Sequence, residues 1–447
     1  MTSPRSDAHT YTLIVGLGVT GMSVVRHLRK LGESMMVVDS RDIPPALNEF
    51  KQSFSDIPLV TGKFDSKLFN NAQRIVVSPG VPLNDPVLLQ ARENGVEITG
   101  DIDLFAHEVD APVVAITGSN GKSTVTSLLA LMAQRAGINA VAGGNIGLPV
   151  LDLLTDSREL YVLELSSFQL ESMQHMPMAA SVVLNISPDH MDRYSDVSAY
   201  AMSKQAIYED AACAVVNRDD EFVIRMLNHQ QNTVGFTLGK PAEGDFGLCE
   251  QDAQQYLCTD DEVLINTTEL GIRGQHNYAN ALAALALGSC INLPVQAMIE
   301  ALKEFPGLEH RTQWVAKIDD VNWFNDSKGT NVGATMAAIE GLPGKHVLIA
   351  GGQGKGADFS PLNTVAKQRL RAVVLIGEDA QKIAQAFDRS VPVEFAADMY
   401  EAVRLAASLA KQGDNVLLSP ACASFDMFRD FAHRGEVFIK AVEGLQS

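Results

Sequence analysis

The sequence predicts an α/β protein of three domains, each built around a mostly parallel sheet. Its 447 residues, of which 46% are hydrophobic, are too many for a single core. Short apolar runs typical of buried strands alternate with longer helical stretches along most of the chain. Two glycine-rich turns, near residues 16 and 118, each join such a strand to a helix.

We place the domain limits at glycine and proline turns, which gives domains of residues 1–100, 101–306 and 307–447. The first domain opens with a strand at 11–15, a helix through about residue 31 and a strand at 35–38. This βαβ unit is Rossmann-like, and further strands are expected at 74–77 and 96–98.

The second domain resembles a P-loop-type ATPase with a mostly parallel sheet. We expect strands at 113–116, 160–163 and 181–186, a small antiparallel edge within 234–268, and a helix from about residue 278. The third domain is a second Rossmann-like α/β unit, with strands expected at 314–318, 323–324, 347–350, 373–376 and 416–418.

Composition excludes several classes of function. The formal net charge of −19 disfavours nucleic acid or an anionic membrane as the main partner. No apolar stretch approaches the roughly 18 residues that span a bilayer. The 5 cysteines are scattered without C-x-x-C spacing, and the start lacks a secretory pattern, so a cytoplasmic protein is expected.

The turn after the strand at 113–116 has the residues of a triphosphate site. Gly118 and Gly121 let the backbone approach a ligand closely, Lys122 can reach the outer phosphates, and the Ser123 hydroxyl can hold magnesium. The helix that follows adds its positive end. Ile116 stands where the usual first glycine belongs, so this is a variant loop, but it predicts ATP binding.

The N-terminal turn, Gly16-x-Gly18-x-x-Gly21 followed by Asp39, has the spacing of a dinucleotide fingerprint. Taken alone it indicates NAD. Glycines and a helix N-terminus also hold the diphosphate of a UDP-sugar, so both ligands stay open, beside a purely structural turn.

Two polar residues follow apolar strands of the second domain. Glu164 can complete the oxygen coordination of magnesium begun by Ser123, although it could also be a surface or capping residue. His190 lies between two acids just beyond a strand, where a structural and a catalytic role are equally compatible with the pattern.

Four turns of the third domain carry groups suited to anions and hydroxyls. Arg311, Lys328 and Lys355 suit anionic oxygens, and Asp326 suits ribose hydroxyls. Together with the segment 419–424 they predict a domain that closes over substrate.

Assembled, these motifs resemble the Mur ligases of bacterial cell-wall synthesis, in particular the members that add D-glutamate. The resemblance covers nearly the whole chain. It rests on the phosphate loop and on five further segments: 164–171, 187–194, 276–277, 325–328 and 419–425.

The resemblance implies a role for each matching residue. The implied ATP contacts are Gly118, Ser119, Asn120, Gly121, Lys122, Ser123, Thr124, Asn277, Arg311 and Asp326. The implied UDP-sugar contacts are Gly18, Thr20, Asp39, Ser40, Arg41, Gly80 and Asn145. The implied D-glutamate contacts are His190, Lys328, Thr330, Lys355, Ser424 and Phe431. The implied catalytic residues are Lys122, Glu164, His190 and Lys204. The implied magnesium ligands are Ser123, Glu164, His190 and a carbamylated Lys204.

The implied reaction joins D-glutamate to UDP-N-acetylmuramoyl-L-alanine through an acyl phosphate and a tetrahedral intermediate. It uses ATP and two magnesium ions, in a cytoplasmic monomer that makes peptidoglycan precursors. Four alternatives remain at this stage: another Mur ligase, a folylpolyglutamate-type ligase, an NAD(P)-dependent oxidoreductase and a non-catalytic nucleotide switch.

Overall fold

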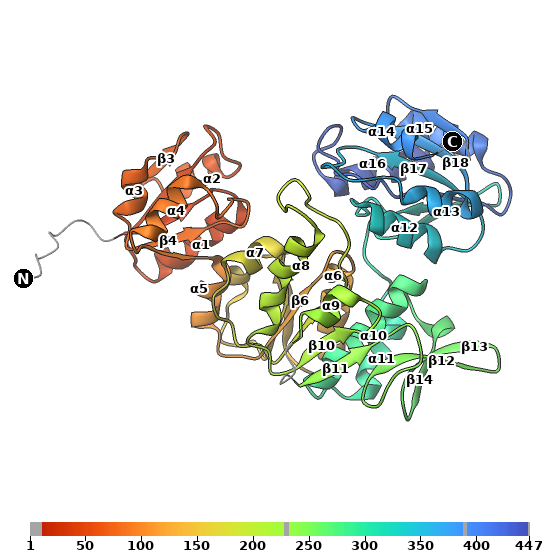
Figure 1. Ribbon diagram of the computed structural model, residues 1–447, viewed down its shortest axis with the longest axis horizontal. Helices are drawn as coiled ribbons and strands as arrows, with labels where there is room; N and C mark the ends of the chain where they lie inside the picture. The colour runs from red at the N-terminus through yellow and green to blue at the C-terminus, as the bar shows by residue number, and fades with distance from the viewer. Residues whose placement is uncertain (1–10, 228–231, 388–390, 446–447) are drawn as a thin grey trace, which may run out of the picture.

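The computed structural model describes residues 11–227, 232–387 and 391–445. Its three sheets follow one another along the chain, with strands inside 12–99, 113–266 and 313–418. Figure 1 shows the three parts as separate bodies, with the central one between the other two. The α/β fold with mostly parallel sheets is therefore confirmed.

The first sheet has the strand order β3-β2-β1-β4-β5, and all of its strands are parallel. This is the order of a Rossmann half, in which the turn after β1 lies at the switch point of the sheet. Its elements are β1 Thr12–Val15, α1 Val19–Lys30, β2 Met35–Asp39, α2 Leu47–Ser53, β3 Leu59–Thr61, α3 Ser66–Asn70, β4 Arg74–Val77, α4 Pro86–Glu93 and β5 Glu97–Thr99.

The central sheet has the order β14-β13-β12-β11-β10-β9-β6-β8-β7. Its elements up to α9 are α5 Asp101–Glu108, β6 Val113–Thr117, α6 Lys122–Arg135, β7 Ala140–Gly144, η1 Val150–Leu153, β8 Leu160–Glu164, α7 Ser167–Ser172, β9 Ala180–Val183, α8 Val197–Gln205, η2 Ala206–Tyr208, β10 Ala214–Asn217 and α9 Glu221–Arg225. The remaining ones are β11 Thr233–Phe236, β12 Phe246–Gln251, β13 Gln254–Thr259, β14 Val263–Asn266, η3 Thr267–Glu269, α10 Gln275–Cys290 and α11 Val295–Glu304.

Two predictions for the central sheet need correction. The antiparallel edge is confirmed for β12, β13 and β14, but β11 pairs parallel with β10 and belongs to the main sheet. The strand predicted at 181–186 ends at Val183, because residues beyond it turn toward the phosphate loop, where the Asn185 carbonyl accepts a hydrogen bond from the Ser119 amide.

The third sheet has the order β15-β16-β20-β17-β18-β19, parallel except for the β15–β16 pair. Its elements are β15 Gln313–Ile318, β16 Val321–Asn325, α12 Val332–Gly341, β17 His346–Gly351, α13 Leu362–Arg369, β18 Leu370–Ile376, α14 Ala380–Ala386, β19 Val393–Phe395, α15 Met399–Leu409, β20 Asn415–Leu418 and α16 Phe431–Glu443.

The apolar cores connect two of the three bodies. One buried cluster contains α1 residues such as Val25 and Leu28 together with η1 residues Val150 and Leu153 and the β8 residue Leu163. The clusters of the third sheet, by contrast, contain only residues of that part of the chain. The first and central bodies therefore share a core, whereas the third has its own.

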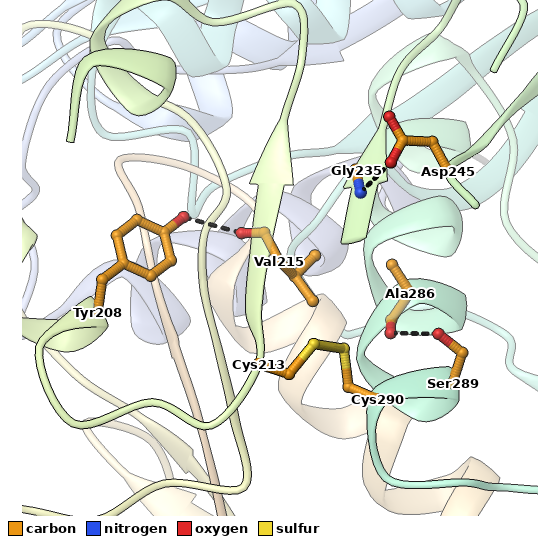
Figure 2. Close-up of a disulfide and its surroundings, with 8 residues drawn as sticks. All are labelled: Tyr208, Cys213, Val215, Gly235, Asp245, Ala286, Ser289 and Cys290. Atoms are coloured by element: carbon orange, nitrogen blue, oxygen red, sulfur yellow. Dashed lines mark hydrogen bonds between the residues drawn. A yellow bond between two sulfur atoms is a disulfide. The ribbon is translucent and has the colours of Figure 1, made fainter. Parts of the chain in front are cut away.

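One pair of cysteines is joined in a disulfide, which the sequence did not indicate. Cys213 precedes β10 and Cys290 ends α10, so 77 residues separate them along the chain while their Cα atoms lie 6.1 Å apart. Figure 2 shows the bond connecting the strand to the last turn of the helix, beside the Ser289 hydroxyl that donates to the Ala286 carbonyl. Cys249, Cys258 and Cys422 are free.

Candidate active site

The phosphate loop runs from the end of β6, which lies between β9 and β8 in the largest sheet, into α6. The Lys122 ammonium donates to the carbonyls of Gly118 (2.8 Å) and Ser119 (2.9 Å). Burial lowers the pKa of Lys122, and the carboxylates of Glu164 and Asp189 oppose that shift. When a nucleotide binds, its outer phosphate oxygens would replace these two carbonyls as the acceptors of the Lys122 ammonium.

Glycine is required at both ends of this loop. Gly118 has φ +146° and Gly121 has φ +88°, conformations that other residues rarely adopt. A Cβ on Gly121 would lie 2.3 Å from Oδ1 of Asn280, which belongs to α10. The predicted nucleotide contact Asn277 lies one turn earlier on that helix, where its Oδ1 accepts from the Asn280 amide (3.3 Å). The N-terminal end of α10 therefore borders the loop.

Glu164 ends β8, the strand beside β6, and only 2% of its surface is exposed. One carboxylate oxygen accepts from the side chain of Asn145 (2.8 Å). The other, Oε2, is buried and has no hydrogen-bond partner. A buried carboxylate oxygen without a partner is costly unless a ligand completes it, which makes Oε2 a candidate cation ligand.

His190 and Lys204 lie on the other side of the phosphate loop. His190 has φ +57°, and its ring contacts that of Phe168, with centroids 4.8 Å apart. Burial lowers the pKa of His190, and the charges of Lys355 and Lys122 lower it further. The carboxylate of Asp189 opposes this shift, but the net lowering favours the neutral ring, which is the form that binds a metal ion.

Lys204 is a buried lysine, 1% exposed, on α8. Its ammonium donates to the Thr117 hydroxyl (3.2 Å) and lies over the Tyr200 ring, 4.7 Å from the centroid. No carboxylate of the described residues forms an ion pair with it. Burial and the charge of Lys122 bring the pKa of Lys204 well below its usual value.

The third body contributes a cation directly to the phosphate loop. Arg311 donates to the Ser123 hydroxyl (2.7 Å), across 188 residues of sequence. Asp326, predicted beside it, is buried and accepts from the Thr312 amide and the Ser419 hydroxyl. Burial raises the pKa of Asp326 to about 6.

Of the residues predicted for D-glutamate, Lys328 and Phe431 contact each other. The Lys328 ammonium lies 3.8 Å from the centre of the Phe431 ring. Burial lowers the pKa of Lys328 to about 8, and the charges of Arg311, Lys122 and Lys355 add to that effect. These cations therefore converge. Among the described residues, the side chains of Thr330 and Ser424 make no hydrogen bond with the rest of this set.

The residues predicted for the UDP-sugar come together. A cleft of about 550 Å³ lies beside the turn after β1. All seven predicted residues line it, namely Gly18, Thr20, Asp39, Ser40, Arg41, Gly80 and Asn145. Asn145 also donates to Glu164, so one residue that lines the cleft contacts the carboxylate at the end of β8, the strand beside β6.

Asp39 is already engaged by protein groups. It accepts from the Leu17 amide (2.7 Å) and from two nitrogens of Arg41 (2.9 and 2.6 Å). Burial alone would raise the pKa of Asp39, but these bonds hold it below its usual value. In a dinucleotide fingerprint this acid binds ribose hydroxyls, so the Arg41 pair disfavours the NAD interpretation.

Sequence reasoning missed residues that hold the loops in place. Asn185 exchanges hydrogen bonds with the Asn120 backbone, at 2.9 and 3.0 Å. Asn331 of the third body donates to the side chains of Asn120 and Asp189, which lie in two loops of the central body. Asp189 lies within the segment 187–194, whereas Asn185 and Asn331 lie just outside the segments that carry the resemblance. None of the three stands in a sequence pattern that indicates its partner.

Among the described residues, no three His, Cys, Asp or Glu side chains form a group able to hold a metal. The predicted ligand set differs from such a group because it includes the Ser123 hydroxyl and a modified lysine. In the part of the chain that the structure describes, no helix is both long and apolar enough to cross a bilayer.

Three family models match the chain in order. They are the Mur ligase MurD-like N-terminal domain at residues 10–100, the Mur ligase middle domain at 116–288, and the Mur ligase glutamate ligase domain at 310–422.

Proteins from two bacteria that are similar to this chain over nearly its whole length have the same name. The UDP-N-acetylmuramoylalanine–D-glutamate ligase of Nitrosococcus oceani is 51% identical over 98% of this chain and 97% of its own. The ligase of that name from Pseudomonas aeruginosa is 50% identical over 97% and 98%.

Solved structures show the same fold at low identity. The UDP-N-acetylmuramate-alanine ligase MurC of Thermotoga maritima matches with a TM-score of 0.60 at 18% identity, over 98% of this chain and 100% of its own. MurF of Acinetobacter baumannii matches with a TM-score of 0.64 at 17% identity, over 98% and 92%.

Proposed function

Because this chain belongs to the Mur ligase family, we propose that it joins D-glutamate to UDP-N-acetylmuramoyl-L-alanine with cleavage of ATP to ADP and phosphate. One observation carries the proposal. Asn145 lines the cleft of the UDP-sugar residues, and its amide donates to Glu164 at the end of β8, beside the strand that leads into the phosphate loop. A substrate held in the first body would therefore present its far end to the nucleotide in the second.

The proposed reaction has two steps. A carboxylate oxygen of the substrate attacks the γ-phosphorus of ATP, ADP leaves, and an acyl phosphate forms. The D-glutamate amine, after losing a proton, attacks the acyl carbon; the tetrahedral intermediate then collapses, breaking the C–O bond and releasing phosphate. Phosphorylation is needed because hydroxide leaves a carboxylate poorly. Positioned cations provide most of the stabilisation in phosphoryl transfer.

Lys122 and Arg311 would stabilise the charge of the transferring phosphoryl group. Lys122 extends over the loop from the second body, and Arg311 reaches the same loop from the third. Two cations at one loop suit a phosphoryl group whose charge is spread over its equatorial oxygens.

Magnesium fits the residues present. Ser123 and Glu164 would hold one ion, and the buried, unpartnered Oε2 of Glu164 is the group that needs it. His190 and a carbamylated Lys204 would hold a second. When bound, these ions neutralise phosphate oxygens and increase the electrophilicity of phosphorus.

Carbamylation of Lys204 is supported by its surroundings. Burial and the charge of Lys122 lower the pKa of the Lys204 amine, which favours its neutral form. The neutral amine is the form that adds to CO₂, giving an N-carboxylate with loss of one proton. The product is an anion in a position that lacks one. ¹³CO₂ labelling followed by NMR tests this: a carbamate signal that disappears in Lys204→Ala is expected, and no signal would reject the modification.

D-glutamate binding is supported by the convergence of cations in the third body. Its two carboxylates would pair with Lys328 and Lys355, with Thr330, Ser424 and Phe431 shaping the pocket. The charge of Lys355 also lowers the pKa of His190, another residue predicted for this ligand. A cytoplasmic, monomeric enzyme with domain limits at residues 100 and 306 stays our prediction from sequence.

The deciding experiment measures ADP release with UDP-N-acetylmuramoyl-L-alanine and each of D-glutamate, L-glutamate and D-alanine. We expect turnover with D-glutamate alone, and a loss of at least about a thousandfold in Lys122→Ala. ADP release that ignores the amino acid would support a nucleotide switch. Turnover with another amino acid would indicate a different ligase.

A further inference from the structure

Asn331 has two functions in the structure. Its Oδ1 accepts from the Ala334 amide (2.8 Å), which caps the N-terminus of α12. Its Nδ2 donates to Oδ1 of Asn120 (3.2 Å) and to Oδ2 of Asp189 (3.2 Å). Asn120 also donates back to Asn331 Oδ1 at 3.4 Å. The capping residue of a third-body helix is thus bound to two loops of the central body.

The two partners of Asn331 are the loops of the proposed chemistry. Asn120 lies in the phosphate loop and is held there by Asn185. Asp189 precedes His190 and accepts the His190 amide on its other oxygen, Oδ1 (3.0 Å). One amide group therefore contacts both the nucleotide loop and the loop of the predicted metal ligand.

The approach at this point is close. Asn331 is 7% exposed, and a Cβ on its neighbour Gly333 would lie 2.9 Å from the Ser187 hydroxyl oxygen. Buried polar contacts of this kind exist only while the third body lies against the central one. Lys328 and Thr330, predicted to bind D-glutamate, directly precede Asn331.

We propose that Asn331 is a positioning residue that fixes the D-glutamate segment against the phosphate loop and the His190 loop when the third body closes. The proposal rests on the proposed function for its substrate, but not for its geometry. A helix cap without this role is the alternative, and the two differ in what the Nδ2 group contributes.

Two substitutions separate them. Asn331→Ser keeps a good helix cap but removes the amide that reaches Asn120 and Asp189. Asn331→Asp also keeps the cap, and places a carboxylate against that of Asp189. Adding Asp189→Asn to Asn331→Asp removes this repulsion. The new amide at position 189 can then donate a hydrogen bond to the new carboxylate at position 331.

For Asn331→Ser we expect kcat/KM for D-glutamate to fall about 10-fold to 50-fold, with nucleotide affinity within about threefold and the melting temperature within about 2 °C of the parent. For Asn331→Asp, kcat/KM for D-glutamate should fall further. Adding Asp189→Asn should raise kcat/KM at least about fivefold above that of Asn331→Asp alone. Activity of Asn331→Ser within twofold of the parent, or no recovery in the double variant, would overturn the proposal.

Small-angle scattering gives a second measurement that does not depend on the reaction. With a non-hydrolysable ATP analogue, the parent should be more compact than Asn331→Asp, and the double variant should return toward the parent. Equal compaction in all three rejects the positioning role. If the parent showed no D-glutamate-dependent turnover but the compaction differed as expected, the proposed function would fail while the role of Asn331 in closure would stand.

Discussion

The central body meets its two neighbours through very different surfaces. Toward the first body the contact is a continuous apolar core, in which α1 packs on η1. Toward the third body the contacts that reach the site are polar: Arg311 to Ser123, and Asn331 to Asn120 and Asp189. We call these two contacts the first joint and the second joint. Separating an apolar contact costs much free energy, whereas the groups of a polar contact can exchange their partners for water.

The difference between the two joints indicates that they have different roles. The first joint holds the UDP-sugar cleft against the sheet that carries the phosphate loop, since Asn145 lines the cleft and donates to Glu164 of that sheet. The second brings cations to that loop and can release them. Substitutions should therefore affect stability at the first joint and catalysis at the second.

Arg311→Ala should show the largest effect. It removes a cation that donates to the phosphate loop, so we expect kcat/KM to fall roughly a thousandfold while the melting temperature changes by less than about 3 °C. Steady-state ADP release and calorimetry measure the two. Arg311→Lys, which keeps the charge without the planar fork, should be intermediate. A large loss of melting temperature would contradict the division between the joints.

Leu153→Ala tests the apolar joint. Leu153 is 3% exposed and belongs to the cluster shared by η1 and α1. Its truncation should lower the free energy of unfolding by about 2–5 kcal/mol, measured by urea denaturation, because it removes burial and leaves a cavity. Leu148→Ala, at a position 57% exposed, is the control and should change little. Equal effects of the two would argue against a shared core.

Asp101→Asn should change the pH dependence of stability. Asp101 lies at the first joint, where the Gln169 amide donates to Oδ2 and Oδ1 has no partner. Burial raises its pKa from 3.8 to about 6. Below 3.8 the carboxyl is protonated in both states and costs nothing; as pH rises to about 6 the unfolded state ionises first, so stability falls.

This effect of Asp101 saturates at about 3 kcal/mol above pH 6. The difference in unfolding free energy between Asp101→Asn and the parent should therefore grow between pH 4 and 6 in favour of the variant. Asp326 titrates in the same pH range in both proteins, so its contribution cancels in the difference between the variant and the parent. A constant difference across that window would show that Asp101 is not perturbed.

Arg26→Ala should show the smallest effect. Arg26 pairs with Asp152 across the first joint, but the two side chains are 36% and 22% exposed. Solvent screens such a pair, so a loss of about 0.5–1 kcal/mol is expected in the same urea experiment, with unchanged kcat. A loss as large as that of Leu153→Ala would mean that the ion pair, rather than the core, holds the joint.

The sequence predicted local features well. The strand before each glycine-rich turn, the turn itself and the helix after it are contiguous in the chain, and the structure confirms both turns. Some strands were missed. β3 has only three residues, Leu59–Thr61, and none of them is buried, but the five-residue β7 and the largely buried β10 were missed as well. The last part of the strand predicted at 181–186 failed because contacts with the phosphate loop outcompete the sheet.

What the sequence determined by itself is the type of each group: a lysine in a glycine turn, acids and a histidine at strand ends, cations in the turns of the third body. Their chemistry depends on residue type and on short spacing, which are visible in one dimension. Only the tertiary structure decided which of them meet. The pairing of Arg311 with Ser123, the orphaned oxygen of Glu164 and the double use of Asn331 depend on how separate sheets pack, and no spacing along the chain encodes that.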